Sequence, residues 1–523
     1  MRSHCVTRCW RAVATVASES DFVPDKRLHP LSWLFALLAF IRQFIVPLIV
    51  IVVFDVRDDG SAWGALFVIP LAVAALWRQF LFRYGFGPRG LVIREGLFFR
   101  NVRKIEYERI ENVDTQRGIL HRLMNVAEVR LESSTGGKPE ALIRVLGDAA
   151  VQELRERIFS GTHHEQAAPT THAAAERSGE VLLKLPPAEL VRYGFVDNRG
   201  MIVVAAIFGV WAQTGAMQGI GHYLTNEVFT NGAGTLGLSL LLVAVGVFVT
   251  IVLVVRSLSL LWALVTLHDF TLSRYGGDLR IRYGLLTRVT LTLRLPRIQA
   301  VHRTETFLHR FFGRVSLAVD LAGDGGQQVD EHGSPQNHMR WLAPICTPRQ
   351  SVEIARIALP MIEQDSAPQW QPLAPGAKLR VFRRFFLVAT IVCAVPAVFW
   401  LQYRAPLVWL VIVPWGWMHA TLYVRHTRWA LTRKAILYQR GWLTRRLSIV
   451  PRNRVQVVQE IVSPFDRRRR MATLVVDTAG ASALTGIMRI RYLPVAEVRR
   501  VARELYVSAE DFAPRRAAAA GRG

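Results

Sequence analysis

Arginine recurs at two fixed distances from three glycines, Gly96, Gly284 and Gly441, which serve as reference positions for an internal repeat. A guanidinium group presents a fork of donors that fits carboxylate and phosphate oxygens. The arginines therefore either pair with acidic residues inside the fold or bind an anionic ligand, and recurrence in three otherwise different copies favours the structural role. Position +13 after these glycines is Arg109, Arg297 and Arg454 in the three copies. Position +26 is Arg122, Arg310 and Arg467. Position +36 is acidic in every copy: Glu132, Asp320 and Asp477.

Arg467, at position +26 of the third copy, begins a run of four adjacent arginines. From Arg425 to Tyr506 there are 18 Lys and Arg against 5 Asp and Glu, a net charge of +13, whereas from Arg83 to Ile158 there are 14 against 11, a net charge of +3. Such a basic surface is either a solvated face or a site for anionic lipid headgroups. The headgroup hypothesis assigns that contact to Arg467, Arg468, Arg469 and Arg470.

Motifs for enzyme chemistry are missing from the sequence in the contexts that they require. It has no phosphate-binding glycine loop, no GxSxG, no HExxH and no dinucleotide-binding glycines. The dense acidic cluster Asp55, Asp58 and Asp59 lies in a short polar turn without a histidine nearby. We therefore expect no enzyme activity, no catalytic residues, no cofactor and no metal. We expect no metal or redox site at the cysteines and clustered histidines, which are Cys5, Cys9, Cys346, Cys393, His163, His164 and His172.

Composition places the chain in a membrane. Of its 523 residues 51% are hydrophobic, yet the net charge is +25, a combination typical of a membrane protein with a basic cytoplasmic face. Stretches of about 20 apolar residues are long enough to cross a bilayer. Six such stretches form three hairpins: Leu31–Phe54 with Ala62–Phe82, Gly200–Gly219 with Leu236–Val255, and Phe385–Leu401 with Pro406–Val424.

The distribution of Lys and Arg between the two ends of the hairpins predicts their orientation. The short links inside the hairpins contain only Arg57 and Arg404, whereas the opposite flanks are rich in Lys and Arg, which favours a cytoplasmic location for both termini and for the long segment after each hairpin. Arg42, inside the first stretch, is interpreted as facing a neighbouring helix or reaching the interface. Because the basic segments are tethered to the membrane, we expect no nucleic-acid partner.

The segment after each hairpin reads as antiparallel strands followed by one amphipathic helix. In the second copy, Leu279–Tyr283 and Val289–Leu295 alternate in polarity on either side of Gly284, and two further strands fit Val315–Leu321 and the region of Met339–Leu342. Three helices should close the copies. Their signals are Asp148 with the stripe Val151, Leu154 and Ile158; the capping box Thr347–Gln350; and the stripe Val498, Val501 and Leu505.

The motifs Leu295–Val301, Phe307–Gly313 and Val319–Gly323, with their counterparts Arg454–Val458 and Val476–Gly480, resemble the bacterial pleckstrin-homology-like repeat of YdbS/YdbT-type membrane proteins. Departures are Glu111, where glutamine is typical, and Ser133–Gly136, where Thr-Ala-Gly is typical. The resemblance implies α-helical transmembrane hairpins plus three β-rich domains, each with two roughly orthogonal antiparallel sheets capped by a C-terminal helix. It implies little about chemistry, because a fold does not fix a function.

The predicted organisation leads to a functional hypothesis. We expect a multi-pass protein of the cell membrane, a scaffold that presents its modules to anionic inner-leaflet lipids or to a partner protein, such as another membrane protein of the same family, in envelope stress or antimicrobial resistance. The alternative is a transporter or lipid-handling protein with broken helices, for which Pro47, Pro70, Pro396 and Pro414 are the indications. The expected segments are an N-terminal cytoplasmic segment (1–30), hairpin 1 (31–82), repeat one (83–160), a flexible linker (161–183), a juxtamembrane segment with hairpin 2 (184–267), repeat two (268–362), a linker with hairpin 3 (363–424), repeat three (425–507) and a disordered tail (508–523).

Overall fold

The computed structural model of the chain contains two compact units. One unit contains repeat one, and the other contains repeats two and three. The described residues are 26–30, 32–35, 37–38, 77, 81–87, 90–96, 101–107, 110–133, 141–160, 179–197, 236–322, 340–362, 367–396, 405–479 and 488–505.

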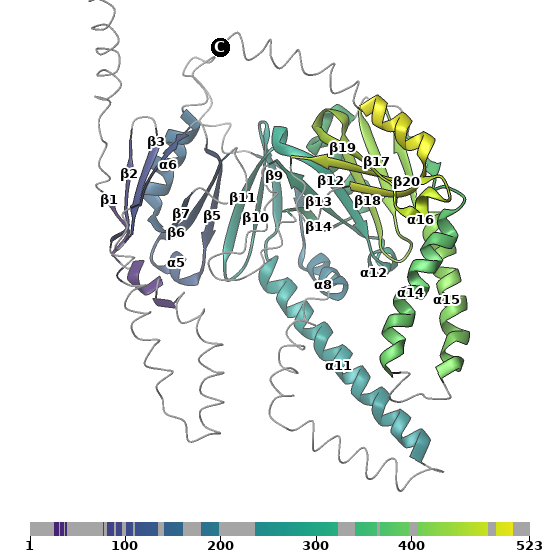
Figure 1. The fold of residues 1–523 in the computed structure, drawn as a ribbon. Coiled ribbons are helices and arrows are strands. Elements are labelled where there is room, and N and C mark those ends of the chain that lie inside the picture. Colours follow the sequence, from purple (N-terminus) through teal and green to yellow (C-terminus); the bar gives the residue numbers. More distant parts are fainter. Residues whose placement is uncertain are drawn as a thin grey trace, which may run out of the picture. The chain divides into compact units, whose positions relative to one another are not determined.

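Repeat one consists of two groups of antiparallel strands and a closing helix (Figure 1). The first group is β1 (Lys26–Arg27), β2 (Arg83–Phe86), β3 (Gly90–Glu95) and β4 (Asn101–Glu106), paired in that order. The second group pairs β5 (Ile110–Arg117), β6 (Val126–Ser133) and β7 (Ala141–Gly147), with the short helix α5 (Ile119–Leu123) before β6 and α6 (Asp148–Ser160) after β7.

Repeat two has the same order of elements. Its first strands are β8 (Glu180–Lys184), β9 (Thr271–Tyr275), β10 (Asp278–Tyr283) and β11 (Arg288–Arg294), and helices α8 (Pro187–Val196) and α11 (Leu236–Thr266) lie between β8 and β9. After the 3-10 turn η3 (Leu295–Arg297) come β12 (Ile298–Glu305), α12 (Phe307–Phe311), β13 (Val315–Leu321), β14 (Arg340–Cys346), α13 (Pro348–Ala358) and η4 (Pro360–Ile362).

Repeat three completes the pattern. Strand β15 (Gln371–Pro372) precedes helices α14 (Ala377–Pro396) and α15 (Ala405–His426), which lead into β16 (Arg428–Leu431), β17 (Ala435–Arg440) and β18 (Arg445–Pro451). The turn η7 (Arg452–Arg454) then leads to β19 (Val455–Ile461), α16 (Pro464–Arg467), β20 (Met471–Thr478) and β21 (Met488–Pro494), and a helix follows at 495–505.

The strand registers confirm the gap-free alignment of the three repeats. The residue three before the reference glycine pairs with the one seven after it in every copy: Ile93 with Arg103, Ile281 with Leu291, and Tyr438 with Ser448. Positions +17 and +35 also pair in every copy: Val113 with Leu131, Val301 with Val319, and Val458 with Val476.

The three reference glycines make the turns that the alignment requires. Gly96, Gly284 and Gly441 all have positive φ, in the region that side chains other than glycine rarely adopt, and each follows the first strand of a hairpin. At Gly284 an added Cβ would lie 2.0 Å from the backbone oxygen of Thr287. The glycine is therefore required both by its φ and by the close approach of the opposite backbone.

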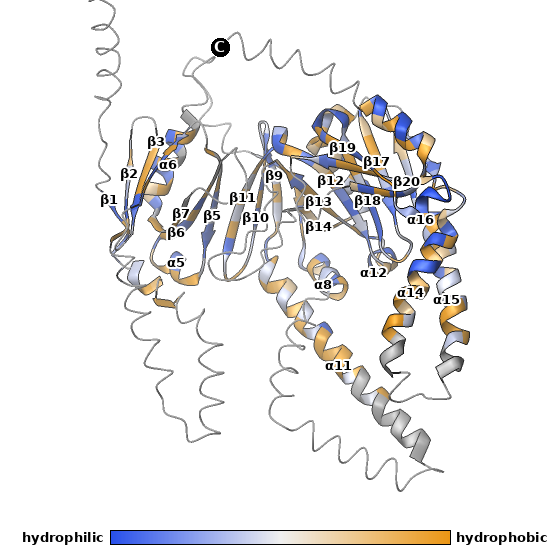
Figure 2. Cartoon of the chain, viewed as in Figure 1, coloured by the Kyte–Doolittle hydropathy of each residue, from blue (hydrophilic) through white to orange (hydrophobic). Residues whose placement is uncertain are grey.

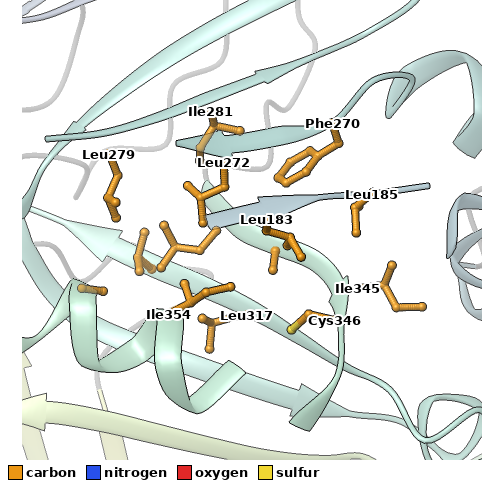
Figure 3. Packing of buried hydrophobic residues seen from close by; sticks show 14 of the residues in the cluster. Leu183, Leu185, Phe270, Leu272, Leu279, Ile281, Leu317, Ile345, Cys346 and Ile354 are labelled. Atoms are coloured by element: carbon orange, nitrogen blue, oxygen red, sulfur yellow. The ribbon is translucent and has the colours of Figure 1, made fainter. Parts of the chain in front are cut away.

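Each repeat keeps its core between the strands and the closing helix. In repeat two, Leu272 and Ile281 from the first group of strands face Leu317 and Ile345 from the second, and Ile354 of α13 covers them (Figure 3). The predicted helical stripes are confirmed, since Val151, Leu154, Ile158, Val498, Val501 and Leu505 are all buried, and Thr347 and Gln350 form the predicted capping box.

The sheets of repeats two and three are not separate, whereas the family resemblance implied two sheets for each domain. Strand β12 pairs with β13 on one side and with β18 of repeat three on the other, with Val301 opposite Ile449 and His302 opposite Ser448. The result is one seven-stranded sheet in the order β14-β13-β12-β18-β17-β16-β15. Backbone donors and acceptors at the edges of both groups are satisfied by this pairing, which is its physical reason.

A second correction concerns the predicted linker at 161–183. Its last residues, from Glu180, belong to strand β8, which pairs with β9. The same arrangement occurs in the other repeats: β1 pairs with β2, and β15 pairs with β16. Each predicted hairpin is thus inserted between two neighbouring strands of one sheet.

Helix α8 holds the domain of repeat two against α11. The Cβ that an alanine would add at Gly194 would lie 2.7 Å from Leu260 Cα, so the two helices are in close contact. Arg314, next to β13, binds both carboxylate oxygens of Glu189 at 2.9 and 2.7 Å, and this ion pair holds the pKa of the Glu189 carboxyl below its ordinary value.

Candidate lipid-headgroup interface

The run Arg467–Arg470 lies on and directly after α16, beside the start of α14. Ser463 caps α16 by accepting a hydrogen bond from the Asp466 amide, and buried Asp466 in turn accepts a bond of 3.1 Å from Arg380 of α14. A Cβ at Gly376, just before α14, would lie 3.4 Å from Arg469 Cδ. The four arginines are all exposed, so α16 fixes them at the entry to hairpin 3 without consuming their charge.

The position of α16 along α14 sets its distance from the predicted apolar span. The Arg380 guanidinium stacks on the Phe465 ring at 4.9 Å, and Arg380 comes five residues before Phe385, where the apolar stretch begins. Five residues of α-helix are roughly 8 Å long. Figure 2 shows the change from hydrophilic residues around α16 and the start of α14 to hydrophobic residues farther along α14.

Exposed apolar side chains lie near the ends of α11, α14 and α15. In repeat two, the Leu285 amide donates to the Val265 carbonyl of α11 at 3.0 Å, which attaches the reference turn to that helix. In repeat three, Trp442 Nε1 donates to His419 Nδ1 of α15 at 3.0 Å. We call these exposed side chains the apolar rim: Leu285, Leu286, Phe307, Phe311, Leu443 and Phe465.

The +26 arginines occupy equivalent helices. Arg122 lies on α5, Arg310 on α12 and Arg467 on α16. Arg310 Nη2 donates to the Leu443 carbonyl at 3.0 Å, so it connects the short helix of repeat two to the reference turn of repeat three. The arrangement combines guanidinium groups with adjacent apolar side chains, which is the combination that binds the headgroup region of a bilayer.

The +13 arginines have a different setting. Arg297 and Arg454 are the last residues of η3 and η7, and Arg297 Nη2 donates to the Ala322 carbonyl at 2.7 Å. The side chain therefore ties the end of β13 to the start of β12. Arg109, the counterpart in repeat one, lies outside the described residues.

The +36 acid of repeat two belongs to a buried polar trio that sequence reasoning missed. Asp320 Oδ2 lies 2.7 Å from His302 Nε2, and His302 Nδ1 lies 2.9 Å from Ser448 Oγ of repeat three. With the carboxylate accepting from Nε2–H, a neutral imidazole leaves Nδ1 to accept the serine proton. All three side chains are buried, and the contact between His302 and Ser448 crosses the β12–β18 seam, so the trio links the two repeats.

The remaining residues considered in the sequence either have a defined structural setting or lie outside the described residues. Within the described part of the chain no group of three or more His, Cys, Asp or Glu could hold a metal ion. Cys346 is buried, and burial raises the pKa of its thiol to about 12. Helix α15 runs unbroken through Pro414, and Pro396 is the last residue of α14. Glu111 is the second residue of β5. The positions outside the described residues are Cys5, Cys9, Arg42, Pro47, Asp55, Asp58, Asp59, Pro70, Gly136, His163, His164 and His172.

Comparison with known proteins agrees with the repeat. The family model described as "Bacterial PH domain" matches three times, at residues 34–162, 231–343 and 383–508. These matches cover most of the sequence and contain all three reference glycines. This chain belongs to the bacterial PH domain family.

A relative that matches over most of both sequences supports a membrane protein of this family. The chain is 21% identical over 486 residues to the UPF0699 transmembrane protein YdbT of Bacillus subtilis (strain 168), covering 87% of this chain and 93% of that protein. No solved structure matches. Among the described residues, one helix meets the length and hydropathy of a membrane span, at Val249–Thr266, with a mean hydropathy of 2.1.

Proposed function

We propose that this bacterial PH domain protein is a non-enzymatic scaffold of the cell membrane. It crosses the bilayer six times, and its termini and three modules are cytoplasmic. Repeat three contacts anionic headgroups through Arg467–Arg470, and the modules form a platform for partner proteins. The family resemblance extends the proposal to envelope stress or antimicrobial resistance.

The observation that carries this proposal is the strand pair at the base of each hairpin. Arg27 pairs with Arg83, Lys184 with Thr271, and Pro372 with Arg428, so the chain leaves each module and returns to it between strands about 5 Å apart. A segment that leaves and returns to the same point crosses a bilayer an even number of times. Three such insertions support the proposal that all three modules lie on one side.

Helices α14 and α15 support the hairpin form directly. They run side by side (Figure 1), and a Cβ added at Gly416 would lie 2.5 Å from the Phe385 ring, which is the close packing that small residues permit between membrane helices. Leu387, Ile391 and Leu410 are exposed along them, as lipid-facing side chains would be.

The cytoplasmic orientation is supported by the residues at the module end of these helices. Lys378, Arg383 and Arg384 precede the apolar part of α14, and Arg425 follows that of α15. Lys378 Nζ lies 4.1 Å from the centre of the Trp417 ring, so a basic and an aromatic residue meet at the level expected for the interface.

The headgroup contact is supported by distance and charge. The field of an anionic leaflet decays over about 8 Å at physiological salt. Arg380 is about this far from the apolar span, and Arg469, beside Gly376, is about 13 Å from it along the chain direction of α14. Each Lys or Arg near that surface contributes about 1 kcal/mol. Four exposed arginines beside Phe465 of the apolar rim can therefore hold repeat three against the membrane surface.

A quenching experiment tests the contact. The full chain, with its native cysteines replaced by alanine and a fluorophore on Leu443→Cys, is placed in nanodiscs that contain lipids with spin-labelled headgroups. We expect Arg468→Ser, Arg469→Ser and Arg470→Ser together to reduce quenching in discs with anionic lipid and to leave it unchanged in neutral discs. Arg467 is kept, because Arg122 and Arg310 occupy the same repeat position on equivalent helices, which favours a structural role for it.

The matched control removes the same charge elsewhere on repeat three. Arg499→Ser, Arg500→Ser and Arg503→Ser change three exposed arginines on the 495–505 helix, which lies at the end of repeat three away from α14 and α15 (Figure 1). The fluorescence of this variant should be quenched to the same extent as that of the parent protein. Equal quenching in the two triple variants, or an effect that ignores salt, would refute the headgroup contact.

A further inference from the structure

The pairing that joins repeats two and three identifies the kind of strand that each repeat accepts. Strand β12 receives β18 antiparallel over Val301–Glu305, so the second sheet of one repeat is extended by the first sheet of the next. At this seam the side chains of the opposed residues His302 and Ser448 approach to 2.9 Å. Every repeat contains a strand of each type, which makes the pairing rule transferable.

Repeat three leaves its acceptor strand at an edge. Strand β19 is the counterpart of β12, and among the described residues it pairs with β20 on one side only. The contrast in exposure is large: Ala300 of β12 is 2% exposed, whereas Val457 at the same repeat position is 54% exposed. Ile461 of β19 is also exposed. An exposed strand edge with apolar side chains is a surface for pairing with another strand.

Repeat one leaves the complementary strand at an edge. Strand β4 is the counterpart of β18, and it is the last strand of the order β1-β2-β3-β4. Its Val102 is exposed, and Arg103 and Lys104 give it a positive charge. Glu460 of β19, whose carboxylate lies 3.6 Å from Arg499 of its own molecule, is exposed at the position that would face this basic part of β4.

We propose that β19 of one molecule pairs antiparallel with β4 of a second copy of this chain. Transferring the β12–β18 register places Val458 opposite Lys104, Gln459 opposite Arg103, and Glu460 opposite Val102. The pairing joins unlike surfaces, so each copy can bind one neighbour through β19 and another through β4, which extends the assembly into a row of molecules. The inference rests on the proposed scaffold function, whose partner it identifies as another copy.

The internal seam shows why such rows suit a bilayer. Helix α11 of repeat two and the α14–α15 pair of repeat three extend from the same side of their unit (Figure 1). The β12–β18 pairing is therefore compatible with neighbouring modules whose helices enter one membrane. Copies joined by the same pairing rule would keep that relation from molecule to molecule.

Disulfide trapping in native membranes tests the pairing. The full chain without native cysteines carries Gln459→Cys and Arg103→Cys, whose positions correspond to the close pair His302 and Ser448 and are within reach of a disulfide. Mild oxidation should produce a ladder of dimers, trimers and larger species. Both positions are exposed, so the unfolding temperature should remain that of the parent.

The control moves one cysteine to the opposite edge of the same sheet. Arg489→Cys on β21 is exposed and combines with Arg103→Cys. We expect the ladder to be at least tenfold weaker. The proposal is overturned by a disulfide inside one monomer, by a Gln459→Cys dimer that needs no second cysteine, by a cross-link to a different protein only, or by no cross-link. None of these outcomes changes the headgroup quenching, so the two proposals fail separately.

Discussion

Replacing Asp320 with alanine should destabilise the unit formed by repeats two and three by about 3 kcal/mol. The change removes the carboxylate that lies 2.7 Å from His302 Nε2 and leaves a buried imidazole nitrogen without its acceptor. Because His302 also contacts Ser448 across the seam, the loss should weaken the β12–β18 pairing. Thermal unfolding of the purified full chain in detergent measures the loss of stability, and the rate of limited proteolysis reports the opening of the seam.

The control for this variant is Asp477→Ala, the same substitution at the +36 position of repeat three. Asp477 is only half-buried and lies on β20, away from the β12–β18 seam. We expect this variant to lose less than about 1 kcal/mol, as ordinary surface substitutions do. A similar loss in both variants, or no loss in Asp320→Ala, would show that the trio does not hold the repeats together.

Substitution of Gly284 by alanine should cost about 3 kcal/mol or more, because two penalties combine. Its φ of 111° is unfavourable for any side chain, and the new Cβ would lie 2.0 Å from the Thr287 backbone oxygen. The backbone of the turn cannot yield as a flexible side chain could. The measurement is again the midpoint of thermal unfolding of the full chain.

Gly276 is the matched control, since it lies in the preceding turn of the same sheet and also has positive φ, at 57°. A Cβ there would meet nothing within 4 Å, so only the conformational cost of about 1–2 kcal/mol applies. If Gly276→Ala is as destabilising as Gly284→Ala, the close approach at the reference turn is not what requires glycine.

Local signals predicted most of the elements within each repeat. The alternation around Gly284 gave two strands, the Thr347 capping box gave the start of α13, and the stripe Val498, Val501 and Leu505 gave the last helix. These features depend on neighbours within a few residues, which a sequence displays directly.

The features that the sequence did not reveal depend on contacts between distant parts. Strands β1 and β15 have two residues each, too few for any periodicity, and their partners lie beyond the inserted hairpins. His302 looks like an isolated histidine until β18 brings Ser448 to it. The five-residue helix α12 is also too short for a helical pattern, although its phenylalanines belong to a motif of the family resemblance. The candidate basic run was identified from charge alone, but its connection to α14 through Asp466 and Arg380 required the fold.

Thiol accessibility in intact cells tests most directly the central claim that three hairpins hold all the modules on the cytoplasmic side. Single cysteines are introduced into the cysteine-free chain as Ser61→Cys, Thr230→Cys, Gln402→Cys and Ser334→Cys, and a membrane-impermeant maleimide is added before and after permeabilisation. We expect labelling of the first three positions in intact cells and of Ser334→Cys only after permeabilisation. Labelling of Ser334→Cys in intact cells, or protection of any of the other three, would contradict it.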